Sequence, residues 1–162
     1  ERPVGSTRDM RTWYTTRVAE PTQRSQISHI VVDSGWEKYA ANVAETHPDV
    51  AAWAKNDHLG FHILYLWNGT KRKYIPDFLV RFKSGKILVL EIKGEDSPQD
   101  QAKRRAMDQW VQAVNAQGGL GHWAWDVVVG SMAAMQDVMA KHASQAGIDD
   151  ARHSDNLTSE TV

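Results

Sequence analysis

One segment of the chain, residues 87–93 with the sequence ILVLEIK, constrains the fold more than any other. Its first four side chains are all aliphatic, a pattern that is typical of a strand with both faces buried. A strand of this kind lies in the centre of a sheet and needs a packing layer on each side. The segment therefore predicts an α/β fold in which helices cover a mixed sheet.

The rest of the chain supplies helices and strands for such a fold. Apolar residues at helical spacing predict helices over 35–46, 98–117 and 131–143, with a further short helical piece over 49–56. Branched and aromatic content bounded by turn residues predicts strands over 11–18, 27–32, 61–67, 73–82 and 122–129. We expect a mixed central sheet of about four to five strands flanked by helices.

The length of 162 residues suits one hydrophobic core. We divide the chain into an N-terminal strand and connecting segment over 1–32, a main domain over 33–142 and a polar tail over 143–162 that we expect to be disordered. The chain begins with Glu1 rather than Met, so we expect a domain cut from a longer protein.

Composition excludes several classes of protein. The chain has no cysteine, so it has neither disulfides nor a thiolate zinc site. No apolar run reaches the roughly 18 to 20 residues that span a bilayer, and no signal peptide opens the sequence, so we expect a cytoplasmic protein away from membranes. The net charge of −1 does not decide for or against nucleic acid.

Three charged side chains stand within or at the end of apolar strands, where buried charge is costly without a partner or a purpose. Asp77 interrupts the run YIPDFLV, and Glu91 and Lys93 end the run ILVLEIK. Because side chains alternate along a strand, Glu91 and Lys93 share one face, and pairing of neighbouring strands can bring Asp77 onto it. We therefore expect these three side chains to converge.

Such a group has the chemistry of phosphodiester hydrolysis. Carboxylate oxygens suit the hard cation Mg²⁺, and an ammonium group can orient or activate the attacking water. Pro76 cannot donate to a strand ladder, which favours an edge or a bulge beside the group. A structural ion-pair cluster is the alternative interpretation, because a P-D pair followed fourteen residues later by E-x-K also arises by chance.

The order of helix, three strands, helix and strand, with YIPDFLV and LEIKG in the second and third strands, resembles the PD-(D/E)XK nuclease superfamily. Over roughly residues 13–129 the chain is similar to the C-terminal nuclease region of type III restriction Res-like subunits, which are fused to a DEAD/DEAH-type helicase. The likeness is carried by TTRVAEPTQRSQISHIVVDSGWEKYAANVAE, VAAWAKNDHLGFHILY, YIPDFLVRF, LVLEIKGE and GHWAWDVV.

This resemblance implies a restriction-endonuclease-like core that hydrolyses DNA with Mg²⁺, for which Mn²⁺ would substitute. By position, Asp77 and Glu91 would ligate the metal, and the backbone carbonyl of Ile92 would be a further ligand. Lys93 would contact the nucleophile or the scissile phosphate.

The resemblance also matches Glu37, on the first predicted helix, to an acid that many members add to the metal site. Two alternatives stay open. Glu37 can be a solvated helix acid beside Lys38, and Glu45 is a competing acid on the same helix.

The partners that the resemblance implies are DNA, a helicase/ATPase region of the same longer chain, and a methyltransferase or specificity subunit of a restriction defence system. Cutting both strands normally needs two active sites, so we expect dimerisation on DNA. A non-catalytic nucleic-acid-binding or assembly module with the same fold is the alternative function, and RNA is an alternative substrate.

Basic residues near the predicted site are candidates for phosphate contact, although each can also be an ordinary solvated surface. They fall in two clusters, Lys71, Arg72 and Lys73 before the Asp77 strand and Lys103, Arg104 and Arg105 on the following helix. Lys55 and Asn56 match a recurring element of the family, with a helix cap as the simpler interpretation. The tryptophans Trp110, Trp123 and Trp125 fall in apolar patterns that favour core packing over base stacking.

Overall fold

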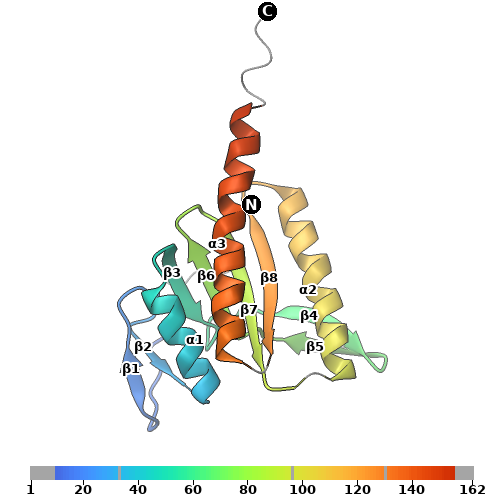
Figure 1. The fold of residues 1–162 in the computed structure, drawn as a ribbon. Coiled ribbons are helices and arrows are strands. Elements are labelled where there is room, and N and C mark those ends of the chain that lie inside the picture. Colours follow the sequence, from blue (N-terminus) through green and yellow to red (C-terminus); the bar gives the residue numbers. More distant parts are fainter. Residues whose placement is uncertain (1–9, 33, 96, 130, 156–162) are drawn as a thin grey trace, which may run out of the picture.

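The fold was analysed in a computed structural model, which describes residues 10–32, 34–95, 97–129 and 131–155. Its centre is a four-stranded mixed sheet with the strand order β3-β6-β7-β8 (Figure 1). The strands are β3 (Val50–Lys55), β6 (Phe78–Phe82), β7 (Ile87–Lys93) and β8 (Trp123–Val129). β6 runs antiparallel to β3 and β7, whereas β7 and β8 are parallel. The predicted mixed α/β sheet with β7 as a central strand is confirmed.

Helices cover both faces of this sheet. The helices α1 (Gly35–Thr46) and α3 (Met132–Asp155) pack on the face that carries Leu88 and Leu90 of β7. The opposite face carries Val89, which packs in a second cluster with the crossover helix α2 (Pro98–Gln117) (Figure 1). Successive side chains of β7 thus enter two separate cores, as the aliphatic sequence of this strand predicts.

Two short strands, β4 (Ile63–Trp67) and β5 (Thr70–Tyr74), form a hairpin outside the main sheet. Its turn residues Asn68 and Gly69 have φ of 50° and 72°, a conformation that favours these residue types. We predicted one strand over 73–82, but the structure divides it into β5 and β6. Pro76 lies at the break, where the chain leaves the hairpin and enters the main sheet.

Two other predictions of secondary structure are wrong. The segment 49–56, predicted to be helical, contains β3, because five of its six strand residues are buried and its backbone pairs with β6. Alanine favours helices locally, and strand pairing overrides that preference here. The predicted strand over 11–18 is absent; Tyr14 and Val18 are exposed, and the pairing begins with β1 (Ala19–Pro21) against β2 (His29–Val31).

The helix boundaries of α1 and α2 agree with the predictions. Ser34 caps α1 through its side chain, and Ser97 with Asp100 forms a capping box on α2. α3 continues to Asp155, past residue 143, where we expected a disordered tail to begin, and 156–162 lie outside the described residues. Within the described part of the chain, no helix combines the length and apolarity needed to cross a membrane.

Asp126 of β8 ties α3 to the sheet. Its Oδ2 accepts a hydrogen bond from the buried His142 Nε2 at 2.9 Å and one from Lys141 Nζ at 2.8 Å. Burial alone would raise the pKa of Asp126, but the hydrogen bonds from His142 and Lys141 hold it below its usual range. The charged carboxylate therefore favours the folded state.

We predict that Asp126→Asn lowers the free energy of unfolding at pH 7 by about 1–3 kcal/mol. Because the folded-state pKa is depressed, the carboxylate contributes its stabilisation above the unfolded-state pKa near 3.9 and loses it as the pH falls further. Urea unfolding at several pH values should thus show a difference from the unaltered chain that narrows below about pH 4. The exposed Asp137 of α3 supplies the control Asp137→Asn. A difference that does not vary with pH would contradict this account.

Candidate active site

The end of β7 carries the two charged residues predicted for the site. Glu91 and Lys93 alternate with Ile92 and share the face of Val89, which lies toward α2. Contacts with α2 agree with this orientation, because Lys93 Nζ lies 2.6 Å from Asp100 Oδ1. Glu91 is 8% exposed, so β7 takes a carboxylate into the core at this end.

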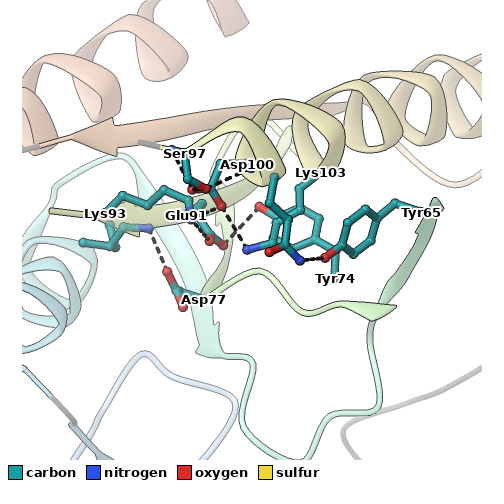
Figure 2. A network of polar contacts seen from close by, with 10 residues as sticks. Tyr65, Tyr74, Asp77, Glu91, Lys93, Ser97, Asp100 and Lys103 are labelled. Atoms are coloured by element: carbon teal, nitrogen blue, oxygen red, sulfur yellow. Dashed lines mark hydrogen bonds and ion pairs between the residues drawn. The ribbon is translucent and has the colours of Figure 1, made fainter. Parts of the chain in front are cut away.

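Asp77 is held beside β7 by its backbone and its side chain. Its Oδ2 accepts a hydrogen bond of 2.7 Å from the backbone N–H of Ile92 (Figure 2). Its carbonyl accepts another of 2.7 Å from the N–H of Asn56, which follows β3. The break after Pro76 thus places Asp77 between the ends of β3 and β7, and the structure brings it to the same place as Glu91.

The surroundings of the two carboxylates raise the pKa of both. Burial, followed by the negative charge of Glu91, raises the pKa of Asp77 to about 7, against the hydrogen bond from Ile92. Burial also raises the pKa of Glu91, although the charge of Lys93 and the Tyr74 hydroxyl oppose this. The pair therefore holds negative charge at some cost in free energy, which a nearby cation would reduce.

Lys93 belongs to a polar network at the start of α2 (Figure 2). Its Nζ lies 3.3 Å from Glu91 Oε1 as well as 2.6 Å from Asp100 Oδ1. Asp100 Oδ1 also accepts from Lys103 Nζ at 3.0 Å, and its Oδ2 accepts from the Ser97 hydroxyl at 2.6 Å. Burial would lower the pKa of Lys93, but Asp100 and Glu91 raise it, so the ammonium stays charged.

The sequence prediction missed Asp100 and Tyr74. Tyr74 donates its hydroxyl hydrogen to Glu91 Oε2 at 3.0 Å, and burial with the charge of Glu91 raises its pKa. The spacing of Ser97 and Asp100 before an amphipathic helix is a capping signal that could have found Asp100. No comparable signal marks Tyr74, whose place depends on how the hairpin folds onto α2.

Glu37 lies near this group but pairs with another residue. Its Oε2 is 3.0 Å from Lys55 Nζ, and its charge contributes to the raised pKa of Asp77. Lys55 also approaches Asp57 Oδ2 at 3.0 Å and donates to the Val31 carbonyl at 2.8 Å. The interpretation of Glu37 as an acid solvated beside Lys38 is therefore wrong: Lys38 pairs with Glu20.

Glu45, the competing helix acid, has a structural role. Its Oε1 accepts hydrogen bonds from the backbone N–H groups of Gln23 at 2.8 Å and Arg24 at 3.0 Å. Its Oε2 accepts from Trp53 Nε1 at 2.7 Å. Glu45 thus fixes the segment between β1 and β2 against α1 and β3, away from Asp77.

The residues predicted to contact DNA occupy different environments. Lys55 and Asn56 are only 4% and 6% exposed, and the Asn56 amide donates to the carbonyls of Phe61 and Pro76 at 2.9 Å. The helix-cap interpretation of this pair is wrong, since Lys55 ends a strand. Lys103 belongs to the Lys93 network, Arg104 is half-buried on α2, and Lys73 is exposed on β5.

The three tryptophans predicted to pack in the core are partly buried and pack against the cluster between the sheet and α2. Trp110 and Trp123 meet edge to face with ring centroids 5.1 Å apart, and Phe61 packs against Trp110 at 5.2 Å. Trp125 joins the same cluster between α2 and β8. These contacts hold α2 in the position that brings Asp100 to Lys93.

The donor set of the site suits a hard divalent cation. Asp77 and Glu91 supply carboxylate oxygens, and burial with the charge of Glu91 raises the pKa of Asp77, so a bound cation would stabilise its ionised form. In the part of the chain that the structure describes, no group of three or more His, Cys, Asp or Glu side chains is arranged to hold a metal ion. Asp77 and Glu91 are therefore two carboxylates without a third acidic ligand beside them in the described structure, and Glu37 pairs with Lys55.

Comparison of the chain with protein-family models, curated proteins and solved structures found no match to any of the three.

We predict that Asp77→Asn stabilises the fold at pH 8. The raised pKa means that the ionised Asp77 disfavours folding, with no effect below the unfolded-state pKa near 3.9 and the full effect above the folded-state pKa of about 7. The amide oxygen of Asn can still accept from Ile92. Urea unfolding should give a gain of about 1–3 kcal/mol at pH 8 and almost none at pH 4.

Asp137→Asn, on the exposed surface of α3, is the matched control for this measurement. A loss of stability in Asp77→Asn at pH 8 would mean that the carboxylate stabilises the fold and that its charge is well compensated by neighbouring groups.

Proposed function

We propose that the chain carries the active site of a metal-dependent endonuclease that hydrolyses DNA phosphodiester bonds, with the PD-(D/E)XK type of centre. One observation carries the proposal: burial and the charge of the buried Glu91 raise the pKa of the half-buried Asp77, and Lys93 lies 3.3 Å from Glu91 at the same end of β7. Groups with perturbed pKa values concentrate at functional sites.

Asp77, Glu91 and the backbone carbonyl of Ile92 would hold Mg²⁺, with Mn²⁺ as a substitute. The bound ion would supply charge stabilisation for the phosphoryl oxygens and lower the pKa of the attacking water. Glu37 forms an ion pair with Lys55, so it would act on this centre through its charge and not as a metal ligand.

The chain's own groups have separate roles in this proposal. The N–H of Ile92 fixes the orientation of the Asp77 carboxylate, and the Tyr74 hydroxyl fixes that of Glu91. Lys93 provides a fixed ammonium group for the nucleophile or the scissile phosphate. Asp100 positions Lys93 and keeps it charged, because it accepts from Nζ at 2.6 Å.

The biological setting remains part of the proposal. The similarity to Res-like subunits favours a nuclease domain that works with a helicase/ATPase region of a longer chain and, in a restriction system, with a methyltransferase or specificity subunit. Two copies on DNA would allow both strands to be cut, since each proposed site can cleave one strand at a time.

The test is cleavage of supercoiled plasmid by the chain with Mg²⁺ or Mn²⁺, against EDTA. We predict metal-dependent nicking or linearisation that falls at least about 100-fold in Lys93→Ala, because the charge-stabilising group is lost. The exposed Lys83 in the turn after β6 supplies the control Lys83→Ala, which should cut like the unaltered chain.

A non-catalytic nucleic-acid-binding module is favoured by one feature of the site, the engagement of Lys93 by two carboxylates. Binding of DNA in EDTA by the unaltered chain and by Lys93→Ala alike, without cleavage in Mg²⁺ or Mn²⁺, would support that module and overturn the nuclease. Cleavage that survives Lys93→Ala would place the active site elsewhere. Cleavage of a matched RNA in preference to DNA would correct the substrate.

We predict that Asp100→Asn lowers the cleavage rate about tenfold with little change in KM for DNA. Asparagine can still cap α2, but it lacks the charge that holds the Lys93 ammonium. The pKa of Lys93 should therefore fall, and the upper limb of the pH-rate profile should move to lower pH. A lower rate with an unshifted profile and a reduced melting temperature would show a purely structural role for Asp100.

A further inference from the structure

A groove of about 360 Å³ lies along the contact between the β4–β5 hairpin and α2. The hairpin contributes Leu64, Tyr65, Leu66 and Lys71, and α2 contributes Ala102, Arg105, Ala106 and Gln109. Figure 2 shows Tyr74 of the hairpin and Lys103 of α2 near Glu91, with Tyr65, which lines the groove, beyond Tyr74 on the side away from Lys93. Gln99, in the first turn of α2, donates to the Tyr65 hydroxyl at 2.6 Å and links the groove to the site.

The outer face of the hairpin carries an unusual pairing of side chains. Ile63, Tyr65 and Tyr74 point inward to the α2 cluster, where each is buried. On the other face, cross-strand pairing sets Leu64 opposite Lys73 and Leu66 opposite Lys71. Leu64 and Leu66 are 52% and 67% exposed, so two leucine-lysine pairs face outward.

The charge of this groove has one sign. Its two charged lining residues, Lys71 and Arg105, are both cationic, and no carboxylate among the residues that the structure describes lines it. Among the described residues, Lys71 and Arg105 make no ion pair, in contrast to Lys93 and Lys103, which share Asp100. Lys73 and Arg72 extend the positive charge along β5. The unneutralised cations favour a polyanion as the occupant.

Position and length give the occupant a direction. From Asp100 to Gln109, α2 advances roughly 14 Å. Phosphates of one DNA strand are spaced about 3.4 Å apart along the DNA axis, so this length matches about four of them. The groove therefore extends from the lysine network away from Asp77 and Glu91. A second copy of this chain is disfavoured as the occupant, because two identical cationic hairpins would repel each other.

We propose that the β4–β5 groove binds the phosphate backbone of the DNA strand that reaches the Asp77 and Glu91 site. This inference rests on the proposed nuclease function. Lys71 and Arg105 contact phosphates, with Lys73 and Arg72 as flanking charges, and Leu64 and Leu66 contact the sugars. The groove thus selects for strand position rather than for sequence, because none of these contacts requires a base edge.

The experiment measures binding of a fluorescein-labelled DNA duplex to the chain in EDTA, by anisotropy at several salt concentrations. The test variant carries Lys71→Gln with Arg105→Gln. The matched control carries Arg81→Gln with Lys83→Gln, which removes two exposed cations at the opposite end of β6. We expect the test variant to weaken binding about tenfold and to reduce the salt slope by roughly 1.8, as the loss of two phosphate contacts requires. The control should bind like the unaltered chain.

Equal binding by the test variant and the control would overturn the groove, as would the absence of DNA binding in the unaltered chain. These outcomes are distinct from the plasmid test. Metal-dependent cleavage together with unchanged DNA binding by the test variant would support the nuclease and contradict DNA binding in the groove. DNA binding that is weakened in the test variant, without any plasmid cleavage, would support the groove and contradict the nuclease.

Discussion

The structure depends on the compensation of charge at the end of a buried strand. β7 is aliphatic from Ile87 to Leu90 and then places Glu91 and Lys93 on the face toward α2. A carboxylate that is 8% exposed is tolerable only with close partners, and Lys93, Tyr74 and, through Lys93, Asp100 provide them. The position of α2 and the inward turn of the hairpin follow from this requirement as much as from apolar packing.

Much of the fold could be predicted from the sequence because its strongest signals are local. The aliphatic run of β7, the amphipathic period of α2 and the cap before α1 each predict their element with matching boundaries. The convergence of Glu91 and Lys93 follows from strand alternation alone. The placing of Asp77 needed only the assumption that neighbouring strands pair.

The features that were missed depend on contacts between distant parts of the chain. β3 is rich in alanine and becomes a strand only because β6 and the packing of Trp53 make it one. β5 is separate from β6 because the residues before Pro76 pair with β4 instead of joining the main sheet. Glu37 and Glu45 look equivalent on one helix, and only the fold assigns one to Lys55 and the other to the N-terminal segment.

Asp100 bonds both the cap of α2 and the Lys93 ammonium, and this has a consequence for incompletely folded copies of the protein. Asp100 Oδ1 accepts a hydrogen bond from the Lys93 ammonium, and Asp100 Oδ2 accepts one from the Ser97 hydroxyl. The orientation of Lys93 therefore depends on a formed first turn of α2. A chain that is newly made, partly unfolded or clipped near α2 would lack an aligned lysine. Under the proposed nuclease function, this link would keep incompletely folded copies inactive on DNA.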